Sequence, residues 1–86
     1  MREEPAWLQK ARETHRYHRL KLTEHNHWTI EQTAKSLRRS TGSICEDLLI
    51  IRWSREWLDD LMKFDYAYEV LKFIRKKEKE LELKKF

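Results

Sequence analysis

The sequence contains few of the residues that turns, hairpins and cross-links require. Its 86 residues include one glycine, one proline and one cysteine. With so few turn residues and no run of alternating β-branched residues, a strand-rich fold is disfavoured. The single cysteine excludes an intramolecular disulfide and a thiolate zinc cluster, which agrees with a reducing compartment. These absences predict an all-α fold.

Long hydrophobic runs are also missing. No apolar stretch approaches the length of a membrane span, and the N-terminal residues lack the pattern of a signal peptide. We therefore expect an intracellular protein, in the cytoplasm, with no membrane partner. The length suits one compact domain and is too short for two.

The charge is modestly basic and unevenly distributed. The formal net charge is +4, which favours a polyanionic partner. Residues 56–75 carry three basic and five acidic residues, whereas each of the other segments has a small basic excess. The acidic stretch is therefore expected to face away from a nucleic acid.

Apolar spacing and capping residues predict about five helices. The first runs from about Pro5, which suits a first helical turn, to Glu24. After a short loop, Thr29 and Gln32 match a capping box, which starts a second helix of about eight residues. The expected fold class is a small all-α domain of about five helices.

Three further helices are predicted from their N-cap residues. Ser40 is expected to cap a third helix that ends near Trp53, Ser54 a fourth, and Asp65 a fifth. Residues 1–75 are then expected to form the helical domain. Residues 76–86 form a charged C-terminal tail that is either helical or frayed.

The most informative spacing lies at about residues 29–49, where we predict a helix-turn-helix. Ala34 is small enough to let two short helices cross closely, and Leu37 fills the corner between them. Ile44 and Leu48 then form the inner face of the second helix. Each of these four residue types has a packing reason at its position.

This stretch resembles the helix-turn-helix of phage repressors and of ParB-type partition proteins, a likeness that extends over about residues 28–75. The residues before it show no counterpart of the nucleotide-binding domain of partition proteins, so the resemblance implies DNA binding and not partition activity. Arg38 stands where many such motifs place glycine to adopt a positive φ, which predicts a different turn.

The resemblance implies which residues contact DNA. The N-terminal half of the recognition helix would enter the major groove. The base-facing set is then Ser40, Thr41, Gly42, Ser43, Cys45 and Glu46. The phosphate-facing set is Thr29, Gln32, Lys35, Arg38 and Arg39. The expected function is sequence-specific binding of double-stranded DNA. The protein would act as a phage, plasmid or bacterial regulator or accessory factor associated with the nucleoid. We expect no enzymatic activity, no metal and no cofactor.

Other interpretations remain open. The helices after Ser54 and the tail, with Leu81, Leu83 and Phe86, suit a protein-protein adaptor or a homodimer. Exposed tryptophans would instead suit single-stranded DNA or RNA, although helical spacing favours the core for Trp28, Trp53 and Trp57. Four histidines between residues 15 and 27 lack the carboxylate or thiol partners that a recognised metal motif needs.

Overall fold

The computed structural model describes residues 3–84, and within that range the chain is all-helical with no strand. Its elements are α1 (Ala6–Glu24), α2 (Ile30–Leu37), α3 (Thr41–Leu61) and α4 (Ala67–Lys84). The expected all-α class is confirmed. About five helices were expected, and the described residues form four, of which α3 is kinked at Trp57. Phe86, which was expected to be able to pair with a partner, lies outside the described residues.

The first helix follows its sequence pattern closely. Pro5 is the N-cap residue in an extended conformation, and the helix ends where the His25 N–H donates to the Lys21 carbonyl. Its buried residues follow helical spacing and are Trp7, Leu8, Ala11, Thr14 and His18. The predicted bounds of this helix are confirmed to within one residue.

The third helix is longer than predicted, because Ser54 does not start a new helix. The Ser54 hydroxyl donates to the Ile51 carbonyl three residues earlier, so it bonds within the helix instead of capping one. Within α3 the backbone leaves helical geometry at Trp57, where φ is −118° and ψ is 22°. A kink there joins two helical segments, the second of which ends at Leu61. The predicted end near Trp53 and the predicted cap at Ser54 are both wrong.

The last helix also starts later than predicted and extends further. It begins at Ala67, one residue too late for Asp65 to be its N-cap. The helix continues through the charged tail to Lys84. Good helix formers in residues 76–84 account for this length, and Lys77 packs over the Trp57 ring at 5.4 Å from the ring centroid.

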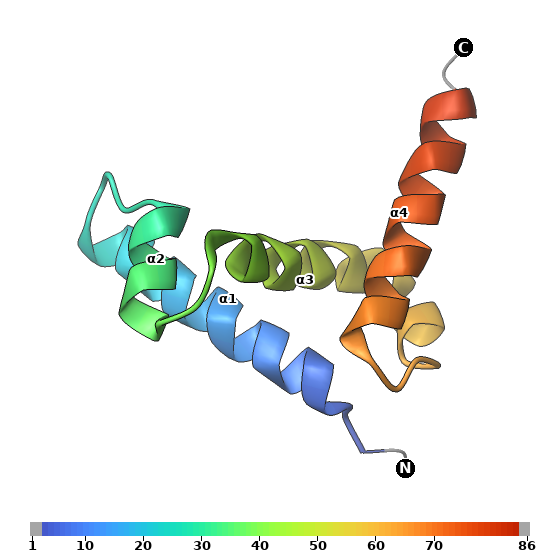
Figure 1. Cartoon of the computed structure of the whole chain (residues 1–86), viewed down its shortest axis with the longest axis horizontal. Coiled ribbons are helices and arrows are strands. Elements are labelled where there is room, and N and C mark those ends of the chain that lie inside the picture. The colour runs from blue at the N-terminus through green and yellow to red at the C-terminus, as the bar shows by residue number, and fades with distance from the viewer. Residues whose placement is uncertain (1–2, 85–86) are drawn as a thin grey trace.

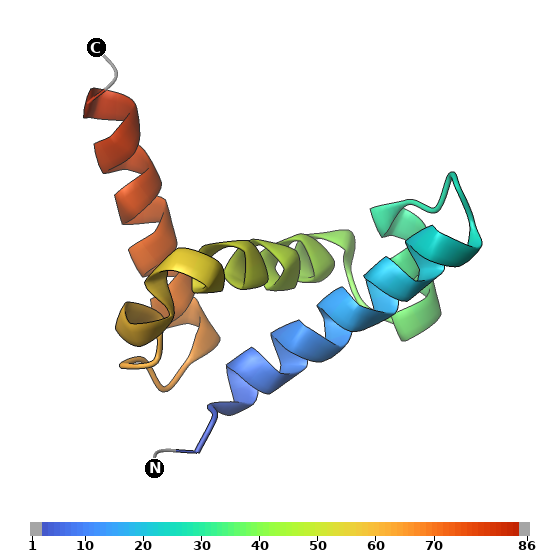
Figure 2. The same ribbon diagram turned by 180° about the vertical axis from the view of Figure 1, so that it is seen from behind.

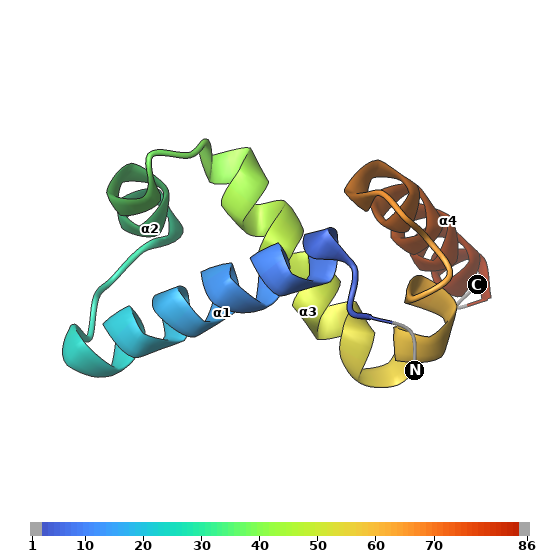
Figure 3. The same cartoon turned by 90° about the horizontal axis from the view of Figure 1, so that it is seen from below.

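The helices form a flat arrangement of 40 × 37 × 21 Å. α1 packs against α3 at an angle, and α2 lies beside the N-terminal end of α3 (Figure 1). α4 packs at the opposite end of α3 and diverges from it toward its own C-terminus, as the view from behind also shows (Figure 2). Seen from below, α2 and α4 stand at opposite ends of α3 (Figure 3).

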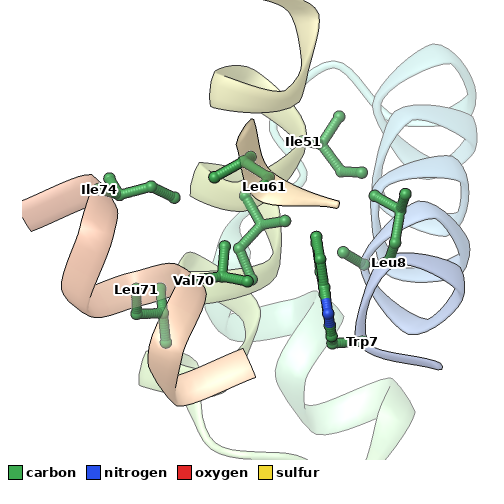
Figure 4. Packing of buried hydrophobic residues seen from close by; sticks show 9 residues of the cluster. Trp7, Leu8, Ile51, Leu61, Val70, Leu71 and Ile74 are labelled. Atoms are coloured by element: carbon green, nitrogen blue, oxygen red, sulfur yellow. The ribbon is translucent and has the colours of Figure 1, made fainter. Parts of the chain in front are cut away.

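A single apolar cluster joins α1, α3 and α4. Trp7 and Leu8 of α1 face Leu61 of α3 and Val70 of α4 (Figure 4). The Trp7 indole N–H also donates to the Phe64 carbonyl at 2.9 Å, which ties α1 to the connection between α3 and α4. This cluster therefore fixes the C-terminal half of the molecule and leaves α2 and the start of α3 on the other side.

Candidate nucleic-acid interface

The starts of α2 and α3 are each fixed by local hydrogen bonds that the sequence predicted. Thr29 and Gln32 form the capping box, with the Thr29 hydroxyl accepting from the Gln32 N–H and the Gln32 side chain accepting from the Thr29 N–H. Ser40 caps α3 by accepting from the Ser43 N–H at 3.1 Å. Three residues, 38–40, separate the two helices, and the predicted length of α2 and both predicted caps are confirmed.

Arg38 adopts the conformation for which glycine is usually required. Its φ is 55° and its ψ is 46°, the left-handed region, and it is the only non-glycine residue with positive φ in the described part of the chain. The N–H of Arg39 then donates to the Ala34 carbonyl, five residues earlier, at 2.9 Å. The expectation that arginine here would give a different turn is therefore wrong. The chain makes the positive-φ turn at a conformational cost of about 1 kcal/mol.

The first turns of α3 expose most of the predicted base-facing residues. Thr41, Gly42, Cys45 and Glu46 are all exposed, while Ile44 is fully buried against the rest of the domain. A Cβ placed on Gly42 would meet no atom within 4 Å. This stretch is therefore an open surface on a firmly packed helix. Leu37 and Leu48, which were expected to face inward, are half-buried.

Ser43 faces the protein interior instead of the open surface. Its hydroxyl accepts a hydrogen bond from the Arg39 guanidinium, and the residue is half-buried. Ser40 is exposed, but its hydroxyl oxygen is occupied by the cap. The remaining four predicted base-facing residues form the accessible part of the set.

Arg39 holds the turn together. One guanidinium nitrogen donates to Asp47 at 2.7 Å, and the other donates to the Thr14 hydroxyl at 2.7 Å. Thr14 in turn donates to Asp47 at 2.8 Å. The Arg39 side chain is 19% exposed and that of Asp47 is 8% exposed. We call Arg39, Thr14, Ser43 and Asp47 the clasp, because they connect α1, the turn and α3.

The clasp removes Arg39 from the predicted phosphate-facing set, because its guanidinium is already bonded within the protein. Lys35 and Arg38 are exposed and have no ion-pair partner among residues 3–84. Thr29 and Gln32 lie at the exposed start of α2, where helix N–H groups suit a phosphate. Sequence reasoning missed Thr14 and Asp47, which lie 33 residues apart along the chain.

A second buried polar group fixes α2 against α1. The Thr33 hydroxyl is fully buried, accepts from the Trp28 indole N–H at 2.7 Å and lies 2.6 Å from His18 Nδ1. The direction of the Thr33–His18 hydrogen bond is set by the tautomer of the imidazole. Burial lowers the pKa of His18 from its ordinary 6.5, and the charge of Arg19 lowers it further.

This pKa shift predicts a loss of stability in mild acid. Below pH 6.5 the unfolded chain binds a proton at His18 that the folded chain does not bind, so the free energy of unfolding falls as the pH decreases. Urea denaturation between pH 7.5 and 5.5 measures it. His18→Gln should reduce the fall. A free energy of unfolding that is constant over this range would contradict the assignment.

Among residues 3–84, no group of three His, Cys, Asp or Glu side chains is placed to hold a metal ion. The histidines have other contacts: His25 stacks on Trp28 with ring centroids 5.4 Å apart, and His18 bonds to Thr33.

The helices in this range also lack the length and apolar character needed to cross a membrane. Comparison with protein-family models, curated proteins and solved structures gave no match.

Proposed function

We propose that this protein binds double-stranded DNA, with α2 and α3 acting as a helix-turn-helix and the start of α3 entering the major groove. The observation that carries the proposal is the open surface of Thr41, Gly42, Cys45 and Glu46 on a helix whose opposite face is buried. In a helix-turn-helix, the N-terminal residues of the second helix contact base edges. The short turn and the small residue Ala34, which is 4% exposed, support this arrangement.

The exposed side chains suggest specific roles at the bases. Glu46 can accept a hydrogen bond from a cytosine amino group, and Thr41 can bond a base or touch a thymine methyl. Gly42, with no side chain and open space before it, allows the backbone to approach the groove. The exposed Lys35 and Arg38 supply phosphate contacts, which add affinity without sequence choice.

A selection of bound sequences from random duplexes tests the proposal. Wild-type protein should enrich a defined sequence, and Glu46→Gln should enrich a different one, since the carboxylate is the group assigned to base recognition. Binding of the selected duplex is then measured by fluorescence anisotropy at fixed salt. No enrichment by the wild type, or the same enriched sequence from both proteins, would contradict the proposal.

Gly42→Ala serves as the companion variant. Because the added methyl group meets open space, the free protein should keep its fold and gain up to about 1 kcal/mol of stability from better helix propensity. Its affinity for the selected duplex should fall about tenfold, because the methyl group occupies the space needed by the base edges. Unchanged affinity would remove Gly42 from the interface.

A second candidate function is supported by the groove between α3 and α4. This groove of about 540 Å³ has apolar side chains at Leu49, Trp53, Trp57 and Leu81, and its charged lining residues are Glu56, Glu78, Glu82 and Arg52. Leu81 and Leu83 are exposed at 47% and 74%. An amphipathic, basic partner segment would fit this surface as an adaptor interaction. Retention of such a partner without DNA, weakened by added salt because it involves the glutamates, would favour this function.

A further inference from the structure

The α1–α3 junction contains a basic groove that the proposed helix-turn-helix does not use. Its charged lining residues are Arg12, Arg16 and Arg19 of α1 and Arg55 of α3, with His15 between them. The groove has a volume of about 430 Å³ and is open to solvent, and Ile51 and Ser54 are its remaining lining residues. None of these residues belongs to the predicted base-facing or phosphate-facing sets. We call them the arginine groove.

The arginine groove carries positive charge that the protein leaves largely unneutralised. No acidic side chain lines it. Arg12 pairs with Glu4 at 3.1 Å, whereas Arg16, Arg19 and Arg55 have no ion-pair partner within residues 3–84. Like charges that share one groove repel each other, so their placement there weakens folding unless an anion occupies the site.

His15 reports this positive potential. Burial lowers its pKa below the ordinary 6.5, and the charges of Arg55 and Arg19 lower it further. The contribution of Arg55 shows that charges from α1 and α3 act on the same point. An anion in the groove would oppose both arginines and raise the pKa of His15.

The spacing of the arginines fits an extended ligand. Arg12, Arg16 and Arg19 follow one face of α1 over two helical turns, a length of about 10 Å. Phosphates of one DNA strand follow each other at about 3.4 Å of rise, so the row matches several consecutive phosphates. The groove is open, and Ile51 is the one apolar residue among its lining residues, so it lacks the mostly apolar lining that is typical of sites for small metabolites.

We propose that the arginine groove is a second nucleic-acid backbone site, which binds the phosphates of duplex DNA without reading its sequence. The site goes beyond the proposed function, because it does not require α3 to contact bases. Arg55 lies ten residues after Cys45, about 15 Å further along α3, so the two surfaces are separate. Guanidinium groups suit it because they bond phosphate oxygens in pairs.

The test compares two triple variants of equal charge. The groove variant is Arg16→Gln/Arg19→Gln/Arg55→Gln, and the control is Arg75→Gln/Lys76→Gln/Lys79→Gln on the exposed surface of α4. The affinity of both variants is measured for a random-sequence duplex, because sequence-specific contacts to bases then contribute nothing to the affinity. The groove variant should bind more than tenfold more weakly than the control near 0.1 M salt. The slope of log affinity against log salt should also flatten by about 2.7, as expected for three lost phosphate contacts.

Thermal melting tests whether the groove variant remains folded, and NMR tests whether duplex DNA occupies the arginine groove. The groove variant should melt at or above the wild-type temperature, because repulsion has been removed. In wild-type protein, titration of the His15 imidazole should give a higher pKa with duplex than without it. Equal duplex affinity for the two triple variants would overturn the proposal, as would a His15 shift with pyrophosphate but none with duplex. The groove variant keeps every residue of the proposed base-facing set, so a selection from random duplexes should still enrich the same sequence as the wild type, which separates this site from failure of the α3 surface.

Discussion

Trp7→Ala is expected to lower the free energy of unfolding by about 4 kcal/mol. The Trp7 side chain is 6% exposed in the cluster that joins α1, α3 and α4, and its indole N–H bonds to the Phe64 carbonyl. Truncation removes a large apolar area and leaves a cavity where three helices meet. For a domain of this size the melting temperature should fall by more than 10 °C. Equilibrium denaturation in urea measures the loss directly.

Two comparison variants separate the contribution of the buried Trp7 ring to stability from that of its indole hydrogen bond. Trp7→Phe keeps most of the apolar area but leaves the Phe64 carbonyl without its donor, so a loss of about 1 to 2 kcal/mol is expected. Tyr68→Ala removes an aromatic ring that is 69% exposed and should change stability by less than about 0.5 kcal/mol. If Trp7→Ala cost no more than Tyr68→Ala, the assigned role of Trp7 in the core would be wrong.

Local chemistry accounts for the parts of the fold that the sequence predicted. The capping box at Thr29 and the cap at Ser40 depend on side chains and N–H groups within three residues of each other. Helical spacing of apolar residues located α1 for the same reason, because both signals act over a few residues. The exposed start of α3 follows from its cap together with the buried position of Ile44.

Local sequence signals gave a wrong prediction where one side chain can form either of two local hydrogen bonds. Ser54 can cap a helix or bond to the carbonyl three residues earlier, and the structure has the second outcome. The departure from helical geometry occurs instead at Trp57, whose ring lies 6.2 Å from Trp53 and 6.4 Å from Phe73 between centroids. Phe73 belongs to α4, so this packing depends on the tertiary fold and leaves no local sequence signal.

The polar contacts beneath the candidate interface were the least predictable feature. Thr14 lies on the buried face of α1, three residues after Ala11 and four before His18, so periodicity alone indicates its burial. Its partners do not follow from periodicity, because Arg39 and Asp47 reach it from distant segments. A pair of adjacent arginines in a turn indicates phosphate contact, yet here one is exposed and the other binds within the protein. Only the tertiary fold distinguishes them.

Asp47→Ala is expected to lower the free energy of unfolding by about 3 kcal/mol, because it leaves the Arg39 cation largely buried without its carboxylate. The clasp also sets the position of α3 relative to α2, so affinity for a selected duplex should fall with stability. Arg39→Met/Asp47→Leu removes both charges and should recover most of the lost stability. Asp60→Ala, which breaks an exposed pair with Lys63 at 3.7 Å, should cost less than about 0.5 kcal/mol. Chemical denaturation of the three variants tests this: a double variant as unstable as Asp47→Ala would show that the loss comes from packing and not from an unpaired charge.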